Sequence, residues 1–301
     1  MEIASAAILP QLIVNGLIAG AMYSLTAAGF SLVYATNRFL NLAHGGIMMV
    51  GAYLVYTFFN LAGLNFYAAS FLAVICTSLF GGFLFVSVYR PLRQKKAANM
   101  VMLIAAAGLA ILLEALVTLI FGTDVKQLNF ISVQEGWHIA GAIITPLQLV
   151  VMAVSAVLLV SFAVFMKYSS WGKLIRAVAD NADLARTTGI NPYAVQLWSF
   201  VIACAIASVA GILIGLERNI EPRMGLGFAL VSFASTVVGG MGSLPGAILG
   251  SYLIGLAENV GQWILPSGYK EAIWLVMLFL FLLIRPSGIF GTEQGVRQTK
   301  L

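Results

Sequence analysis

The chain of 301 residues is 61% hydrophobic and only 9% charged, with a mean hydropathy of +0.98. Soluble globular domains are about half apolar and about a quarter charged, so this composition excludes an ordinary soluble fold and indicates a protein whose solvent is mainly lipid. The net charge of +5 does not indicate a nucleic-acid partner, because most of the positive residues lie in short loops between long apolar runs.

Apolar runs long enough to cross a bilayer recur along the whole chain. A membrane-spanning helix needs about 20 apolar residues, and the clear candidates are 11–34, 42–62, 66–88, 99–122, 145–166 and 195–216. Further runs that are shorter or interrupted cover 228–241, 245–264 and 270–284. The sequence therefore predicts an all-α integral membrane protein, a polytopic bundle of eight to nine membrane segments that forms a single domain over residues 1–301.

Basic residues are distributed unequally between the two sides of such a bundle. With nine spans and the N-terminus outside, the cytoplasmic loops hold 12 of the 16 Lys and Arg residues: Arg38, Arg90, Arg93, Lys95, Lys96, Lys167, Lys173, Arg176, Arg186, Arg285, Arg297 and Lys300. Loops rich in Lys and Arg face the cytoplasm in multi-pass proteins. We therefore expect a multi-pass protein of a bacterial or archaeal cell membrane, with its C-terminus in the cytoplasm. We expect no cleavable signal peptide, because the first ten residues carry Glu2 and no basic stretch.

The longest cytoplasmic loop, residues 167–194, contains the densest stretch of charges of both signs. At helical period one face of a short helix carries Lys173, Arg176, Asp180, Asp183 and Thr187, and another carries Leu174, Ala177, Val178 and Ala185. Arg176 and Asp180 are spaced to support each other as an i,i+4 pair. Gly189 is suited to end the helix, and Asn191 with Pro192 to begin the next span. A small helix of mixed charge fits a protein groove better than a membrane surface, and a solvated connector is the alternative.

Glycines recur within the apolar runs at the spacing of helix contacts. Each of the pairs Gly16–Gly20, Gly211–Gly215 and Gly246–Gly250 makes a GxxxG pattern, which lets helix backbones approach closely in lipid. In "VVGGMGSLPGAILG" (237–250), glycines and Pro245 interrupt an otherwise continuous apolar stretch. Such a discontinuous region either lines a solute path within the membrane or forms a tight cytoplasmic turn between two spans.

Polar residues inside the apolar runs are candidates for a translocation path. Glu114 and Glu258 lie within spans, and ionisable groups there usually face a bundle interior or a cavity. Each carboxylate serves either a structural hydrogen bond or a solute pathway. The candidate path residues are Asn15, Asn41, His44, Glu114, Gly239, Gly240, Gly242, Glu258 and Asn259. For Asn41 and His44 a tight turn, with Asn41 capping the second span, is the simpler interpretation.

The sequence contains no reactive constellation. It has no P-loop, no HExxH, no GxSxG and no paired-cysteine motif. We therefore expect no catalytic residue, no ATPase site and no cofactor bound by this chain. A metal site is not expected either, because His44 has no second ligand at a suitable spacing. Cys76 and Cys204 fall inside apolar runs and are interpreted as buried thiols.

Four stretches of the chain resemble the branched-chain amino-acid ABC permease family, in the order in which the family has them: "NLAHGGIMMVGAYL" (41–54), "RAVADNADLARTTGI" (176–190), "VVGGMGSLPGAILG" (237–250) and "RPSGIFG" (285–291). The resemblance extends over nearly the whole chain and is closest to the smaller of the two permease types. It implies a permease subunit that works with a second homologous permease subunit, two ABC ATPase subunits that use ATP, and an extracytoplasmic substrate-binding protein.

The resemblance also implies a role for the charged loop 167–194. In such importers a short cytoplasmic coupling helix docks on the ATPase, which assigns this contact to Arg176, Asp180, Asp183, Arg186 and Gly189. Branched-chain amino acids are the implied substrates, with urea, short amides or aromatic acids as alternatives within the family. Among other classes of protein, a secondary transporter driven by an ion gradient is the main alternative, ahead of a passive channel or a membrane enzyme.

Overall fold

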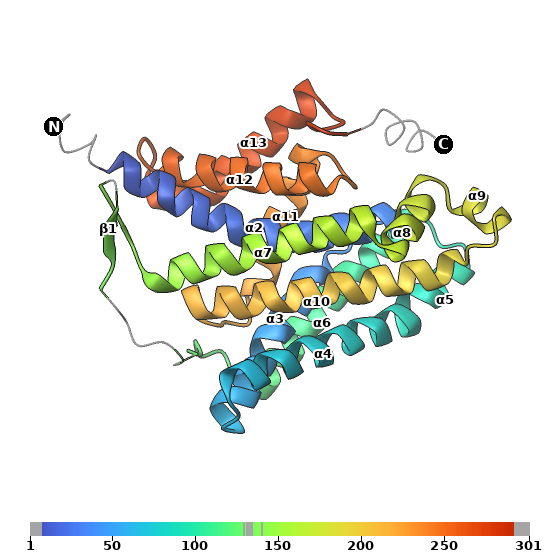
Figure 1. The fold of residues 1–301 in the computed structure, drawn as a ribbon, viewed down its shortest axis with the longest axis horizontal. Coiled ribbons are helices and arrows are strands. Elements are labelled where there is room, and N and C mark those ends of the chain that lie inside the picture. Colours follow the sequence, from blue (N-terminus) through green and yellow to red (C-terminus); the bar gives the residue numbers. More distant parts are fainter. Residues whose placement is uncertain (1–7, 129, 131–134, 140, 292–301) are drawn as a thin grey trace.

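The computed structural model describes residues 8–128, 130, 135–139 and 141–291 of the chain. Figure 1 shows long helices lying side by side in an elongated bundle, with a small β-hairpin at one end and the helices α8 and α9 at the other. We refer to these as the hairpin end and the α8–α9 end. Glu2, Arg297 and Lys300, which contribute to the sequence-based orientation, lie outside the described residues.

A long helix occupies each predicted apolar run. In chain order these are α2 (Leu9–Asn37), α3 (Ala43–Tyr56), α4 (Phe66–Leu84), α6 (Asn99–Phe121), α7 (Pro146–Tyr168), α10 (Pro192–Arg218), α11 (Met224–Gly239), α12 (Leu244–Gly261) and α13 (Lys270–Ile284). The π-helix η1 (Thr57–Leu61) continues α3, and η2 (Phe85–Tyr89) with α5 (Arg90–Gln94) continues α4. The shorter elements are α8 (Ser170–Asp180), α9 (Ala182–Thr187), the 3-10 helix η3 (Ser267–Tyr269) and the antiparallel strands β1 (Trp137–Ile139) and β2 (Ala142–Ile144). The predicted all-α architecture is confirmed.

The predicted number of membrane segments is not confirmed. By length and composition, five helical segments can cross a membrane: α2, Phe66–Gln94, α6, α7 and α10. A sixth candidate is the pair α11 and α12, which is bent by 116° at the predicted break. The helices α3 and α13 have only 14 and 15 residues. At 1.5 Å per residue each is about 20 Å long, which is shorter than a hydrocarbon core of about 30 Å.

The glycine pairs bring helix backbones into direct contact. The most extensive helix contact in the described structure is between α2 and α12. A Cβ added at Gly16 would lie 2.9 Å from Leu256 Cα, and one at Gly20 would lie 2.9 Å from Tyr252 Cα. Since lipid provides no hydrophobic drive for helices to associate, stability depends on such close packing. The predicted role of the GxxxG pairs is confirmed here.

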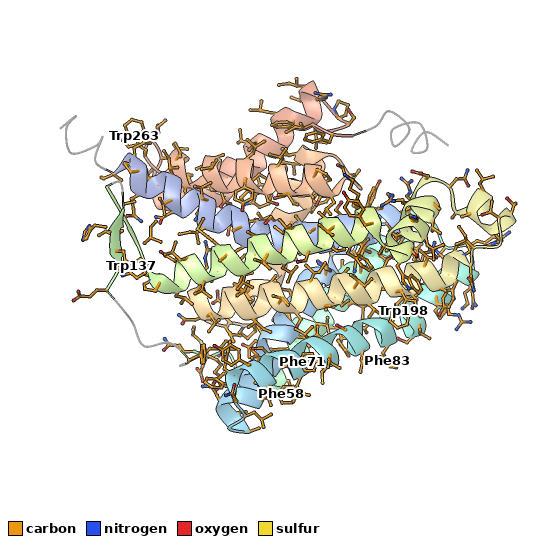
Figure 2. All side chains as sticks on the ribbon, in the orientation of Figure 1. Phe58, Phe71, Phe83, Trp137, Trp198 and Trp263 are labelled. Atoms are coloured by element: carbon orange, nitrogen blue, oxygen red, sulfur yellow. The ribbon has the colours of Figure 1, made fainter. Side chains whose placement is uncertain are left out.

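Apolar and aromatic side chains cover the periphery of the bundle. Phe71 and Phe83, which are labelled in Figure 2, project from α4 and are 67% and 64% exposed. Exposed tryptophans lie near both ends, with Trp137 and Trp263 at the hairpin end and Trp198 toward the other (Figure 2). Tryptophan is enriched where membranes meet water. The outer surface therefore has the pattern of a lipid-facing band between two aromatic borders.

Candidate functional site

The helix α8 is fixed across the end of α7. Ser169 begins α8 and its side chain accepts a hydrogen bond from the Gly172 backbone N–H at 2.8 Å. Ile175 and Val178 are buried against the bundle. Arg176 donates to the carbonyl oxygens of the last turns of α7, at Met166 and Lys167, where a cation is favoured by the exposed carbonyl groups. The predicted Arg176–Asp180 pair is therefore wrong, because Arg176 is bound to backbone oxygens.

The helix α9 is presented at the surface as a separate element. Asn181 ends α8 with an extended backbone, and its side chain accepts hydrogen bonds from the N–H groups of Asp183 and Leu184, both at 3.0 Å. This break means that the predicted single helix over 173–188 is two helices. In α9 only Ala185 is buried, whereas Leu184 is 63% exposed. The exposed surface of α9 therefore combines an apolar side chain with charges of both signs from Asp183 and Arg186.

The end of this loop agrees with the sequence prediction. Gly189 has a φ of +86°, the left-handed conformation that glycine adopts without strain. Asn191 then caps α10 by accepting hydrogen bonds from the N–H groups of Tyr193 at 3.1 Å and Ala194 at 3.4 Å. Pro192 occupies the first helical position. The predicted glycine stop and the new helix start are confirmed.

Arginines connect the α8–α9 loop to the long helices. Arg38, at the end of α2, donates to the carbonyl oxygen of Ala179 in α8. Arg93 of α5 donates to the backbone oxygen of Asn37. These residues border a cavity of about 780 Å³ between α5, the α8–α9 turn and the start of α10. Through these contacts α8 and α5 are both joined to the end of α2, which is largely enclosed by the other helices.

The glycine-rich break is a close turn at the α8–α9 end. A Cβ at Gly239 would overlap the backbone carbonyl of Gly246, so α11 and α12 touch directly. Gly240 and Gly242 have φ values of +115° and +84°. The N–H group of Phe290 donates to the Gly239 carbonyl oxygen at 2.8 Å, so the chain that follows α13 covers the turn. Gly239 and Gly240 are packed against protein backbone and Gly242 lies near Ala35 and Tyr34 of α2, which favours the turn over the cavity-lining alternative.

Two of the candidate polar residues on and between α2 and α3 make hydrogen bonds within the protein, and a third, His44, is buried without a hydrogen-bond partner among the described residues. Asn15 accepts a hydrogen bond from the Gln11 side chain at 3.0 Å, and Asn41 accepts one from the Tyr89 hydroxyl at 2.8 Å. His44 is buried between α2 and α3, beside Gly29. Asn41 does not cap α3, because the N-cap is Leu42 and the Asn41 side chain is turned to Tyr89. The proposed path role of these polar residues stays a prediction.

The two carboxylates within the apolar runs face cavities that adjoin one another around the start of α11. A cavity of about 340 Å³ between α2, α10, α12 and α13 is lined by Glu258, which is only 2% exposed. A second, of about 1040 Å³, is lined by Glu114 on α6. Glu221 and Arg223 line both cavities, so the two lie on either side of the segment that precedes α11. Pro222 and Glu114 also line a third cavity, of about 100 Å³, beside Gly46 of α3.

Each of these carboxylates has a partner that is distant in the sequence. The Tyr23 hydroxyl donates to Glu258 Oε2 at 2.8 Å, and Arg223 Nε lies 4.0 Å from Glu114 Oε1. Asn259 is instead turned to its own helix and donates to the Gly255 carbonyl oxygen at 2.8 Å. Sequence reasoning missed Tyr23, Arg218, Glu221, Arg223 and Lys270 as cavity residues. The mixed charges of "ERNIEPR" (217–223) are the signal that could have indicated this segment.

The thiols and the candidate metal ligands form neither a disulfide nor a metal site among the described residues. Cys204 is buried against Gly81, where an added Cβ would overlap its sulfur, and Cys76 is half-buried. Both cysteines are free. Within the described ranges, no group of three or more His, Cys, Asp or Glu side chains is arranged to hold a metal ion.

Long apolar helices, an exposed helical loop at one end and adjoining cavities with charged linings toward the other define a multi-pass α-helical membrane protein of the transport type. The chain belongs to the family described as "branched-chain amino acid transport system / permease component", whose sequence model matches residues 12–284.

Relatives at full length support this membership. The chain is 33% identical over 299 residues to the high-affinity branched-chain amino acid transport system permease protein BraD of Pseudomonas aeruginosa, covering 94% of this chain and 96% of BraD. It is also 33% identical over 301 residues to the corresponding permease protein LivH of Escherichia coli, with the same coverage. A probable branched-chain amino acid transport permease protein, LivH of Methanocaldococcus jannaschii, is 27% identical over 89% of this chain and 88% of its own length.

A solved structure agrees with the fold. The complex of PsaBC from Streptococcus pneumoniae with Fab contains a chain that superposes with a TM-score of 0.52 at 15% sequence identity, covering 96% of this chain and 98% of that one. At this identity the likeness concerns the arrangement of helices alone.

Proposed function

We propose that this chain is the membrane-spanning permease subunit of an ABC importer, in which it forms part of the translocation path for branched-chain amino acids. A separate binding protein delivers the substrate, and separate ATPase subunits supply the energy from ATP. The observation that carries the proposal is α9, a six-residue helix with Leu184 exposed between charges of both signs. In a chain whose relatives are named as high-affinity amino-acid permeases, this element is suited to dock on an ATPase.

The distribution of charge supports a cytoplasmic position for the α8–α9 end. Arg38, the α5 arginines and the basic residues of α8 and α9 all lie at this end. Loops of this composition face the cytoplasm. The hairpin end, with Asp124 and Glu217, then faces outward and is the side on which a binding protein releases its substrate.

The contacts of the loop supply a mechanism for energy coupling. ATPase closure moves α9, whose displacement reaches α8 through the short turn at Asn181. From α8 it reaches α2 through the Arg38–Ala179 hydrogen bond and α7 through Arg176. Because α2 packs against α12 along its backbone, the movement of α2 changes the walls of the cavity at Glu258. The chain itself contributes no ATP site, and its task is to convert docking into movement of the helices.

The pair of Glu114 on α6 and Arg223 before α11 supports a second permease subunit as partner. Glu114 is 34% exposed and Arg223 is 92% exposed, on a face that also exposes Ile111 and Leu119. Charges in contact with hydrocarbon are costly, so such groups face a protein partner or an aqueous path. A homologous subunit facing α6 would enclose this pair and the cavity of about 1040 Å³, which places the path between two permeases. Two ATPase subunits then bind one such pair.

Uptake into vesicles separates this function from its main alternative. The complex extracted from the native membrane is reconstituted, and uptake of radiolabelled leucine is measured with the binding protein outside and ATP or a non-hydrolysable analogue inside. The proposal predicts uptake with ATP and none with the analogue, whether or not an ion gradient is present. Uptake driven by a proton or sodium gradient without ATP would instead identify a secondary transporter. Competition by isoleucine, valine, urea and acetamide then defines the substrate class.

A further inference from the structure

We infer that the cavity lined by Tyr23, Arg218, Glu258 and Lys270 binds the charged head of a zwitterionic α-amino acid during transport. Glu258 receives the ammonium group, and Arg218 with Lys270 receives the carboxylate. The inference rests on the proposed function and adds to it a substrate-binding site inside the permease.

The acidic group, Glu258, is a buried carboxylate in which only one of the two oxygens accepts a hydrogen bond from the described residues. Glu258 is 2% exposed, so its charge is costly unless hydrogen bonds and counter-charges compensate for the lost water. The Tyr23 hydroxyl satisfies Oε2 at 2.8 Å. Oε1 accepts no hydrogen bond from the part of the chain that the structure describes, although Glu258 lines the cavity. An ammonium group entering the cavity supplies both the hydrogen bond and the opposite charge.

The basic partners line the same cavity from other helices. Arg218 ends α10 with its guanidinium 6.0 Å from the centre of the Phe228 ring, and that ring lies edge to face against Tyr23 at 5.7 Å. Lys270 begins α13 and is half-buried at the cavity wall. A guanidinium binds a carboxylate through two parallel hydrogen bonds, and an ammonium adds a point charge. The cavity therefore contains both an acidic group for the ammonium and basic groups for the carboxylate of a zwitterion.

The remaining wall is apolar and the volume is small. Phe228, Val231 and Trp274 line the cavity beside the charged residues. Its volume of about 340 Å³ is near the lower limit of ligand pockets, which hold about 300–1,000 Å³. An aliphatic side chain on the amino acid would lie against the aromatic wall. A neutral amide or urea carries no charged groups that could pair with Glu258, Arg218 and Lys270, so the cavity favours an amino acid over these smaller solutes.

A second cavity adjoins this one on the side where we propose the partner permease. Glu221 and Arg223, at the start of α11, line both this cavity and the larger one at Glu114. A solute released from Glu258 and Arg218 therefore meets a second acid and a second base along the same segment. This series of paired charges suits the stepwise passage of a zwitterion.

Direct binding tests the inference without the binding protein. The detergent-purified complex is titrated with tritiated leucine in a scintillation proximity assay, for the wild type and for Glu258→Gln and Arg218→Gln. Asp124→Asn is the matched control, because Asp124 is an exposed acid at the same end, with its side chain 84% exposed and paired to Lys126. We expect saturable binding to the wild type and the control, and at least a tenfold weaker affinity in Glu258→Gln and Arg218→Gln.

The chemistry of the ligand provides a second readout. Isoleucine and valine should displace tritiated leucine, whereas leucinol, which lacks the carboxylate, and 4-methylpentanoate, which lacks the ammonium group, should not. Tyr23→Phe keeps the ring contact with Phe228 and removes only the hydroxyl, so a several-fold loss of affinity in this variant excludes gross misfolding as the cause. Co-elution of the ATPase subunits confirms that each variant is assembled.

The outcomes separate this inference from the proposed function. Leucine binding that is unchanged in Glu258→Gln and Arg218→Gln overturns the inference, and so does a wild-type complex that imports leucine without binding it in this assay. Displacement by leucinol or 4-methylpentanoate as strong as by valine also overturns it. A wild-type preparation that contains no ATPase subunit and imports no leucine contradicts the proposed function instead.

Discussion

At the scale of single residues, glycine positions determine how closely the helices approach. Gly45 of α3 faces Gly225 of α11, and an added Cβ would overlap the Gly225 carbonyl oxygen and lie 2.7 Å from Ala229 Cβ. Because the obstruction is backbone, a side chain at Gly45 can be accommodated only if α3 and α11 separate. Gly225 also lines the cavity of about 100 Å³ beside Gly46. The packing of these two glycines therefore sets the distance between α3 and α11, beside the candidate path.

We predict that Gly45→Ala destabilises the protein by about 1–3 kcal/mol, the usual cost of overpacking a close contact. The measurement is thermal unfolding of the detergent-purified chain, followed by loss of the monodisperse size-exclusion peak. Gly108→Ala is the control, because no heavy atom lies within 4 Å of a Cβ built at this helical position. It should be neutral or stabilising by up to about 1 kcal/mol. An unchanged unfolding temperature in Gly45→Ala would show that α3 and α11 are not packed in this way.

At the scale of elements, α9 depends on its cap more than on burial. A helix of six residues is marginal by itself, and only Ala185 of α9 is buried, with Ala182 partly buried beside it. The Asn181 side chain satisfies two of its first N–H groups.

We predict that Asn181→Ala reduces the stability of α9 by about 0.5–2 kcal/mol, the usual loss for an N-cap. Hydrogen exchange of the amides of residues 183–187 should accelerate by about tenfold, with no change in α7. Asn181→Asp retains a capping oxygen and should exchange at the wild-type rate. Equal acceleration in both variants would mean that the cap does not stabilise α9.

The surface of α9 carries the coupling hypothesis. We predict that exchanging the charges, by Asp183→Arg with Arg186→Asp, lowers ATP-driven leucine uptake at least tenfold. Each exchanged side chain then repels the group on the ATPase that the native charge attracts. Leu184→Asp should act in the same direction by placing a charge in the apolar contact. The control is Lys95→Glu with Lys96→Glu, which reverses two exposed charges at the same end outside α8 and α9. Wild-type coupling in the exchanged variant would contradict the docking role.

The elements differ in how well the sequence predicts them. The long helices were predictable because each needs an apolar run, and Gly189, Asn191 and Pro192 marked the end of the loop by their conformational preferences. The break at Asn181 was missed because helical periodicity continues across it, although an asparagine followed by Asp183 fits an N-cap. The start of α11 was missed because its short charged segment has no periodic pattern. The partner of its Arg223 is Glu114, which comes from the distant helix α6.

At the scale of the whole molecule, the number of spans could not be read from hydropathy. Residues 42–62 are apolar over the length of a span, yet α3 has 14 residues before it continues as a π-helix. α11 and α12 are continuous in composition but bent by 116°. Burial among other helices removes the need for each segment to cross lipid on its own, since protein contacts replace hydrocarbon. The side of the membrane on which each loop lies is predicted more reliably than the number of spans, because it depends on the distribution of Lys and Arg.

We predict that the α8–α9 end lies in the cytoplasm and the hairpin end outside. Leu184→Cys and Asp124→Cys are each treated with a membrane-impermeant maleimide in intact cells and in everted vesicles. Asp124→Cys should react in intact cells and Leu184→Cys only in everted vesicles. The chain without an added cysteine is the control for Cys76 and Cys204. Labelling of Leu184→Cys in intact cells would reverse the orientation.

The most direct test of the account is the composition of the assembly in its native membrane. The tagged chain is extracted in mild detergent, purified and analysed by native mass spectrometry together with everything that co-elutes. The account predicts ATPase subunits and a second, related permease with this chain. A homo-oligomer without any nucleotide-binding subunit, reproduced across several detergents, would contradict the assignment as an ABC permease and leave α9 without a docking partner.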